Sequence, residues 1–438
     1  MTATENAISL ETSGIDAKYN KWLNYSILVL AFVIPVSRSG ISIMIFAIPF
    51  LWILEGGWQH KWKILKHDRL IQAITIYVTF ICLSLLWTKN FTTALANAKN
   101  YGHLILIPVM LTSLRYNFRF KIIFAYALGM MSLVILSILN YAGVIKITYY
   151  IIYTSIGTTL DHVHTANVFM HTLDYSMFLA WAVIFGIYFL YNAFKENNIE
   201  ILRKKYMYLW AALIILCLFW IFIQRGRSGQ FAMIFTMIFL FYFMLKNQKK
   251  KYFYAIGVLV FLIFMQYRWN PEFKNRVDHV VSDVDSYSHN IYSSSLGNRI
   301  LAHEIAWEMI KKSWLFGHGI GDNMDIFKQH VEDLQKKMAE EKMPSLRTIY
   351  EVSENHMHSQ YLQVLTETGI IGLIMFFSIF WIFIFKGPNR KISFLITIFF
   401  YTGFLGEPFL RNQFTSVLIC FFMGYIYSEK NMTSAESN

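Results

Sequence analysis

The stretch 356-HMHSQYLQVLTETGIIGLIMFFSIFWIFIF-385 joins the chain's one long polar segment to an apolar run that can cross a membrane. Residues 361–385 carry a single charged side chain, Glu367, and exceed the roughly 20 residues that span a hydrocarbon core about 30 Å thick. His356 and His358 precede the run. Histidine suits base chemistry near neutral pH because its unperturbed pKa is about 6.5. The stretch therefore predicts a proton-accepting group at a membrane surface.

The composition extends this interpretation to the whole chain. Of the 438 residues, 56% are hydrophobic and 15% are charged, whereas a soluble domain has roughly 25% charged residues. Apolar runs recur along the sequence, so we expect an all-α polytopic membrane protein with about twelve transmembrane helices. Helices 1–9 are expected in residues 1–267, a large, mostly helical loop in 268–358, and helices 10–12 with a tail in 359–438.

The distribution of basic residues predicts the orientation in the membrane. The net charge of +12 could indicate a nucleic-acid partner, but basic cytoplasmic loops explain it better. Lysine and arginine cluster in every second loop, at residues 61–69, 115–121, 195–205, 246–251 and 386–391. This alternation predicts that both termini are cytoplasmic and that the large loop lies outside, in the periplasm of a Gram-negative cell. No cleavable signal peptide is expected, because residues 1–20 lack an apolar core.

The large loop is expected to form a small helical cap on the outer mouth of the bundle. Apolar residues recur every fourth position in residues 298–312, which predicts a helix. Asp322 could cap a second helix that reaches about residue 341, before Pro344. The glycine-rich run at 317–321 follows a helix and lacks a lysine, so it favours a turn over a phosphate-binding loop.

Three arginines on the expected outer side are candidates for binding an anion. Arg225, Arg227 and Arg299 lie where the topology rule places few cations. Each could pair with lipid headgroups, but charges kept against an apolar background are functional candidates. The arginine fork matches phosphate oxygens, and the small residues in 226–229 would let the backbone approach a ligand.

Other polar residues could support this site. Glu407 and Arg411 are four residues apart in the last outer turn, so they could pair with each other or line a cavity. Ser359 and His356 flank His358 and are expected to shape its surroundings.

A metal site is not expected. The candidate ligands are His162, His164, His171, Asp161 and Asp174, and no pair among them has a well-known ligand spacing.

Three segments within about residues 224–372 resemble the bacterial O-antigen ligase and polymerase superfamily of membrane glycosyltransferases. His358-Ser359, nine residues, Gly369, two residues and Gly372 follow the signature that the ligases carry at the end of their large periplasmic loop. The segments 297–299 and 317–321, with Trp307, are similar to the pattern that opens the loop helix.

The third segment, residues 226–229, is similar to a short arginine motif at the outer end of a helix. The family usually has Ser-Arg-Gly where this chain has Arg227-Ser228-Gly229 after an extra Arg225. Both arginines therefore stay candidates.

The resemblance implies a GT-C-like glycosyltransferase in the cell inner membrane. Its donor would be a glycan on undecaprenyl diphosphate, and its acceptor a sugar hydroxyl of lipid A–core at the periplasmic face. His358 would be the general base, and Arg227, Arg225 and Arg299 would bind the diphosphate. The anomeric centre would invert, and neither a cofactor nor a metal would be needed. The implied partners are the two glycolipids and membrane lipid.

Two other functions compete with this interpretation. An O-antigen polymerase would use a similar arginine-rich site with a second lipid-linked glycan as acceptor. The single dominant outer loop and the His-Ser signature favour a ligase. A lipid-linked glycan flippase or transporter would be expected to place cations along a path through the bundle and to show an inverted repeat. Here the cations concentrate on one side and no repeat is apparent.

Overall fold

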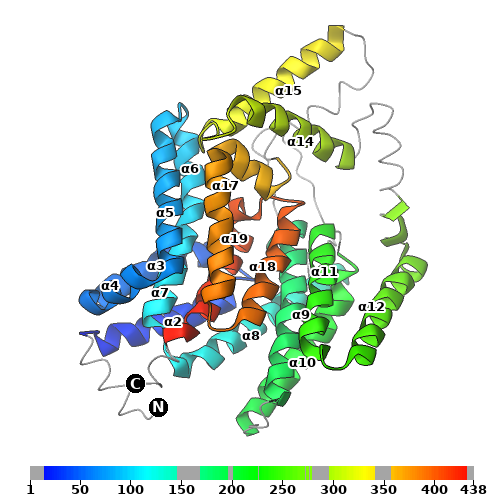
Figure 1. The fold of residues 1–438 in the computed structure, drawn as a ribbon. Coiled ribbons are helices and arrows are strands. Elements are labelled where there is room, and N and C mark those ends of the chain that lie inside the picture. Colours follow the sequence, from blue (N-terminus) through cyan, green and yellow to red (C-terminus); the bar gives the residue numbers. More distant parts are fainter. Residues whose placement is uncertain are drawn as a thin grey trace.

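The computed structural model describes residues 14–145, 168–195, 201–224, 226–271, 273–275, 277–278, 295–340 and 357–431. Every named element in these ranges is a helix, which confirms the all-α expectation. Figure 1 shows a bundle of helices with α14 and α15 lying across one end. We call this the loop end of the bundle.

The elements follow one another along the chain with short 3-10 segments between some of them. Those before the loop are α2 (Ala17–Val33), α3 (Arg38–Leu54), α4 (Trp58–His67), α5 (Arg69–Leu83), η1 (Ser84–Trp87), α6 (Phe91–Tyr101), η2 (Gly102–Ile105), α7 (Leu106–Ser113), α8 (Tyr116–Tyr141), α9 (Thr172–Lys195), α10 (Ile201–Ile221), α11 (Arg227–Leu245) and α12 (Lys249–Trp269). The loop helices and those after them are α14 (Ser295–Lys312), α15 (Asn323–Glu340), α17 (Gln360–Lys386), α18 (Arg390–Phe404), η3 (Phe409–Arg411) and α19 (Gln413–Tyr427).

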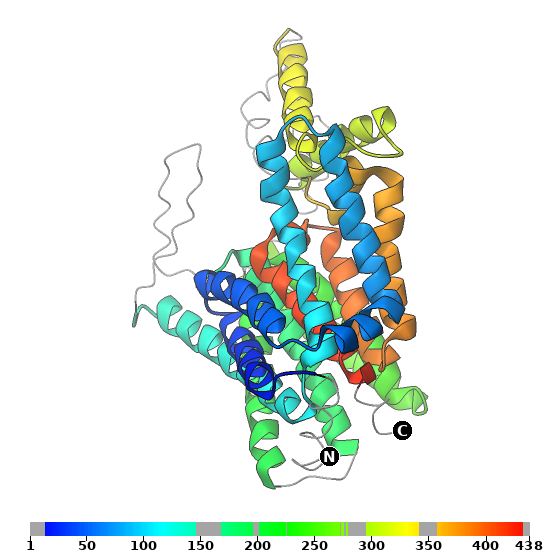
Figure 2. The same ribbon diagram turned by 90° about the vertical axis from the view of Figure 1, so that its left-hand side faces the viewer.

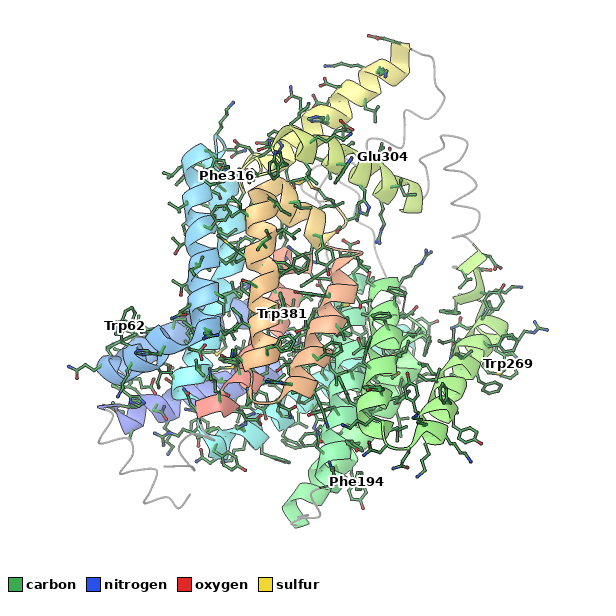
Figure 3. All side chains as sticks on the ribbon, viewed as in Figure 1. Trp62, Phe194, Trp269, Glu304, Phe316 and Trp381 are labelled. Atoms are coloured by element: carbon green, nitrogen blue, oxygen red, sulfur yellow. The ribbon has the colours of Figure 1, made fainter. Side chains whose placement is uncertain are left out.

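Six helices of the described chain are long and apolar enough to cross a membrane by length and composition. They are Arg69–Trp87, Tyr116–Tyr141, Thr172–Lys195, Arg227–Leu245, Lys249–Trp269 and Gln360–Lys386. Large apolar side chains such as Phe194, Trp269 and Trp381 are exposed on the outside of the bundle (Figure 3), as lipid-facing side chains are. These features indicate a multi-pass membrane protein, while the expected total of about twelve spans is not established.

The polar segment that follows η1 is largely helical. The side chain of Asn90 accepts a hydrogen bond from the backbone N–H of Thr93 and so caps α6. α6, η2 and α7 then follow one another without an intervening loop. Figure 2 shows α6 beside α5, and α6 begins at the loop end, where the N–H of Asn90 bonds Asp322. Residues 102–113 therefore continue the helical segment that α6 begins.

The loop is fixed to the bundle where α17 breaks. Gly369 has φ 64° and ψ −166°, so the helix is interrupted there. The backbone groups freed by the break bond to the turn between α14 and α15: the N–H of His318 donates to the Thr366 carbonyl at 2.8 Å, and that of Ile370 to the Trp314 carbonyl at 2.9 Å. The glycine-rich run at 317–321 is thus a turn, as expected, and it docks the loop on α17.

Asp322 also fastens the loop, in a way that the sequence did not predict. Its carbonyl accepts from the N–H of Ile326 as α15 begins, but its carboxylate reaches the α5–α6 connection. There it accepts from the backbone N–H groups of Lys89 and Asn90 at 2.7 to 2.9 Å. The expected side-chain cap for α15 is therefore replaced by a cross-link between the loop and α6.

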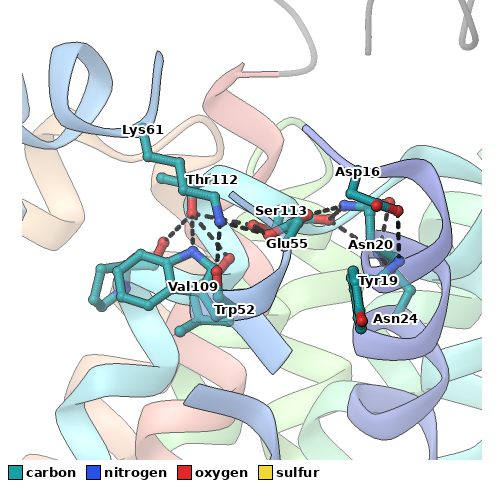
Figure 4. Close-up of polar contacts among 11 residues, drawn as sticks. Asp16, Tyr19, Asn20, Asn24, Trp52, Glu55, Lys61, Val109, Thr112 and Ser113 are labelled. Atoms are coloured by element: carbon teal, nitrogen blue, oxygen red, sulfur yellow. Dashed lines mark hydrogen bonds and ion pairs between the residues drawn. The ribbon is translucent and has the colours of Figure 1, made fainter. Parts of the chain in front are cut away.

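A buried ion pair holds α4 against α2, α3 and α7, away from the loop end (Figure 4). Lys61 and Glu55 are fully buried, and Nζ lies 2.7 Å from Oε2. Lys61 also donates to the Trp52 carbonyl at 2.8 Å, while Ser113 and Asn20 donate to the Glu55 carboxylate. These hydrogen bonds compensate both charges for their loss of water.

Replacing Lys61 with methionine should destabilise this corner strongly. Removing one partner of a buried pair costs about 3–5 kcal/mol, because the other charge stays buried without compensation. The Lys63→Met protein is the matched control, since Lys63 is exposed on the same helix. Thermal unfolding in detergent should show a much lower melting temperature for Lys61→Met and little change in melting temperature for Lys63→Met. Equal melting temperatures would mean that the pair contributes nothing.

Candidate functional site

Glu407 lies at the centre of a polar cluster at the loop end. It stands in the turn between α18 and α19, and its side chain is only 2% exposed. Its Oε1 lies 2.7 Å from Nη2 of Arg299 and 3.3 Å from Nδ1 of His358. A buried carboxylate thus bridges a guanidinium on α14 and an imidazole just before α17. The structure brings together three expected residues from distant parts of the sequence.

His358 occupies a strained backbone position. Its φ is 48°, in the left-handed region, which costs a non-glycine residue about 1–2 kcal/mol. Met357 is buried in the small apolar core of the loop helices, whereas Ser359 immediately precedes α17 and donates to the Phe404 carbonyl of α18 at 3.4 Å. His358 therefore joins two separately anchored segments. Its side chain keeps 27% exposure and can meet a substrate.

Arg299 reaches Glu407 because of its place on α14. Leu301, Ile305 and Met309 bury the apolar face of this helix in the core of the loop. Arg299 lies at the edge of that face, where it is 29% exposed. One guanidinium nitrogen pairs with Glu407, and an arginine carries five N–H donors. The remaining donors can bind an anionic group.

Arg227 begins α11 close to this cluster. A Cβ built on Gly406 would lie 3.2 Å from Oγ of Ser228 and 3.5 Å from Nη1 of Arg299, so the start of α11 and α14 both approach the Glu407 turn. The Arg227 side chain is exposed there. The N-terminus of a helix also favours negative charge, because its first N–H groups have no partner within the helix.

The small neighbours of Arg227 serve helix packing. A Cβ on Gly226 would lie 2.4 Å from Oγ of Ser176, and one on Gly229 would lie 2.2 Å from the Ser176 carbonyl oxygen. The N–H of Gly229 donates to the Ser176 hydroxyl at 3.2 Å. The expectation that these residues let the backbone approach a ligand is replaced by a close contact between α11 and α9.

Arg411 belongs to a second polar cluster. Its Nη2 donates to the Asn97 side chain at 2.9 Å. Nearby, the buried Glu367 accepts from Tyr101 at 2.9 Å and from Gln363 at 2.6 Å. The ion pairs that the structure gives Glu407 instead join it to Arg299 and His358. The two side chains of the last turn therefore serve different clusters.

Some expected residues cannot be placed. Arg225 and His356 lie outside the described residues, as do Asp161, His162 and His164. Within the described ranges, no group of three histidine, cysteine or acidic side chains could hold a metal ion.

His303 is a part of the site that the sequence analysis missed. It follows Arg299 by one helical turn on α14 and lies near His358. Burial lowers the pKa of His303 below its usual 6.5, and the nearby His358 and Arg299 act in the same direction. The four-residue spacing from Arg299 was visible in the sequence and could have indicated a shared helix face.

The arrangement fixes the chemistry open to His358. A carboxylate only accepts hydrogen bonds, so with Glu407 ionised in its pair with Arg299, Nδ1 of His358 must donate. Nε2 is then the nitrogen that can take a proton. Arg299 and the start of α11 both approach the turn that carries Glu407. The cluster can therefore combine a base with groups that stabilise negative charge.

Comparison with known proteins identifies part of this chain. Residues 211–377 match the family model described as O-Antigen ligase. The matched region runs from α10 into α17 and contains Arg227, Arg299 and His358, whereas Glu407 lies beyond it. No curated protein sequence matches the chain.

Proposed function

We propose that the chain transfers a glycan from undecaprenyl diphosphate to a sugar hydroxyl of lipid A–core, because residues 211–377 match the O-antigen ligase family model. The observation that carries the proposal is the contact of Glu407 with both Arg299 and His358. This contact sets a base next to a guanidinium at one end of a membrane bundle. Such a site fits a donor whose leaving group is a diphosphate.

His358 is the base in this reaction. The acceptor oxygen attacks the anomeric carbon from the face opposite the diphosphate, and its proton passes to Nε2 of His358. The bond between the anomeric carbon and the diphosphate oxygen breaks as the new glycosidic bond forms, so the configuration inverts. Glu407 stabilises the imidazolium that results, as the carboxylate partner of a catalytic histidine does.

Arginines stabilise the leaving group. Negative charge develops on the diphosphate as the bond breaks, and fixed cations at that position lower the barrier. Arg299 and Arg227 are supported by their closeness to the Glu407 turn, and Arg225 precedes the same helix in the sequence. No nucleotide is required, because the diphosphate lipid is already activated.

The membrane orientation follows from the charge pattern. We propose that both termini are cytoplasmic and that the loop end faces the periplasm across the bacterial inner membrane. The basic clusters at 61–69 and 115–121 support this assignment, because they lie in α4 and at the start of α8, away from α14 and α15 (Figure 1). A glycolipid acceptor and a polyprenyl donor would then reach the site from the outer leaflet.

The test is a lipopolysaccharide gel from a strain that lacks this gene. We expect polymer-free core, with long lipid-linked chains accumulating in the membrane, and restoration by the wild-type gene. Core carrying a single repeat would instead indicate a polymerase with a second lipid-linked glycan as acceptor. Normal polymer attachment would contradict both enzymes.

A further inference from the structure

Gln360 holds one end of the turn that carries Glu407. It is the first residue of α17, and its side chain is fully buried. Its Oε1 accepts from the backbone N–H of Leu410 at 2.9 Å. Leu410 lies in η3, and the N–H groups at the start of a helical turn have no acceptor within that turn. Gln360 therefore supplies an acceptor for this N–H from another helix.

Ser359 holds the other end of the same turn. Its hydroxyl donates to the Phe404 carbonyl, so the two contacts lie three residues before and three residues after Glu407. Ser359 and Gln360 directly follow His358 in the chain. The segment that carries the base is thus bonded at two points to the turn that carries its carboxylate partner. These contacts keep Nδ1 of His358 within 3.3 Å of Oε1 of Glu407.

The other half of the Gln360 amide gains nothing from burial. Its Nε2 is buried and has no hydrogen-bond partner within the part of the chain that the structure describes. A buried donor without a partner lowers stability, and an apolar side chain of the same shape would avoid that loss. Gln360 is therefore poorly suited to stabilising the fold, whereas its oxygen is well placed to hold Leu410.

We propose that Gln360 is a positioning residue, which holds the Glu407 turn so that the carboxylate fixes the His358 ring and leaves Nε2 of His358 free to accept the proton. This inference rests on the proposed role of His358 as the base. His358 has a left-handed φ of 48°, a conformation that persists only while the surroundings impose it. If the turn moved away, the ring would lose the partner that selects its tautomer.

The experiment compares Gln360→Met and Gln360→Glu in the purified full-length protein. Methionine has a similar shape but is only a weak acceptor, so kcat should fall about 10- to 100-fold, as small misplacements of reacting groups do. KM for the lipid-linked donor should stay unchanged, because Arg227 and Arg299 are anchored on α11 and α14. The melting temperature should change little, since removing the unpartnered Nε2 offsets the lost bond to Leu410. Gln360→Glu keeps an oxygen at this position and should recover most of kcat.

Gln363→Met is the matched control. Gln363 is fully buried one turn further along α17, and its Oε1 also has no partner among the described residues. Its Nε2 donates to Glu367 at 2.6 Å, away from the turn that carries Glu407. The same substitution there should leave kcat close to that of the wild type.

Proton NMR of protein with isotope-labelled histidine reports the contact itself. A proton on Nδ1 that is bonded to a carboxylate gives a signal far downfield, which the His358→Ala protein assigns by its loss. We expect this signal in the wild type and in Gln360→Glu, and its loss or upfield shift in Gln360→Met. No such signal in the wild type would overturn the inference, because Glu407 would then not hold the ring.

The kinetic outcomes separate this inference from the proposed function. Wild-type kcat and an unchanged signal in Gln360→Met, with His358→Ala inactive, would overturn the inference and leave the proposed function standing. Equal losses of kcat and melting temperature in Gln360→Met and Gln363→Met, with no recovery in Gln360→Glu, would make Gln360 structural and also overturn it. Full activity of His358→Ala would overturn the proposed role of the base, whatever the Gln360 variants show.

Discussion

The His358→Ala protein is expected to transfer glycan about 10²- to 10⁴-fold more slowly than the wild type, the range that a positioned general base contributes. Alanine removes the nitrogen that accepts the acceptor's proton, while Arg299 and Glu407 remain paired at 2.7 Å. The diphosphate should still bind, so KM for the donor should change little. Removing the imidazole leaves no buried charge without a partner, because Glu407 stays paired with Arg299. We therefore expect the protein to remain folded.

The measurement is single-turnover transfer by purified protein, with a lipid-linked glycan as donor and lipid A–core as acceptor. His358→Gln should be as inactive as His358→Ala, because an amide can bond Glu407 but cannot take a proton. His330→Ala is a matched control on the loop helix α15 and should be fully active. Transfer by His358→Ala within twofold of the wild type would remove His358 from the chemistry and move the base elsewhere.

The sequence pointed to part of this site because its residues stand out against apolar surroundings. His358 and Arg299 are polar residues beside predicted membrane helices, and charge retained there indicates function. Their bridging by Glu407 was not predictable, since it depends on how α14 lies on the turn after α18. His303 was missed because a four-residue spacing from one arginine is common on helices and does not by itself single out a histidine.

Part of the fold could also be predicted from the sequence, because the pattern of apolar and polar residues reflects burial. Hydropathy identified helices and the two loop helices, because burial in lipid or in a small core imposes the 3.6-residue period. It gave no indication of the helix α6, which forms from the polar sequence at residues 91–101. The polar character there reflects contacts with the loop: Asn97 donates to the Ile320 carbonyl at 2.7 Å, and Asn90 lies against Asp322. Such contacts follow from tertiary structure and leave no periodic signal.

The structural roles of the glycines were the hardest to predict from the sequence. Gly369 and Gly372 were recognised as a family signature, and Gly317 as part of a turn, but neither pattern showed that the two segments meet. A Cβ on Gly317 would lie 2.5 Å from the carbonyl carbon of Glu367, next to the break in α17. Two glycines can allow two backbones to cross, but in the sequence each of them looks only like a glycine at the end of a helix. The sequence therefore does not show that the two segments meet.

The Gly369→Ala protein should therefore lose both stability and transfer. Its φ of 64° and ψ of −166° fall in a region that only glycine occupies readily, which costs another residue about 1–3 kcal/mol. The new Cβ would also lie 2.2 Å from the carbonyl oxygen of Leu315, a backbone atom that cannot move aside alone. The turn of the loop must then lift from α17, and its hydrogen bonds to Thr366 and Ile370 would break.

The displacement of this turn is the reason that the methyl group added in Gly369→Ala should abolish glycan transfer. α14 continues directly into this turn, so the helix that carries Arg299 would move away from Glu407. Limited proteolysis should cut the loop helices of Gly369→Ala faster than those of the wild type, and the melting temperature should fall. Gly257→Ala is the matched control, because a Cβ there meets nothing within 4 Å and alanine is favoured in a helix by about 1 kcal/mol. If Gly369→Ala keeps wild-type proteolysis and transfer, α17 tolerates the new side chain and the loop is held by other contacts, of which the Asp322 carboxylate on α6 would be the strongest.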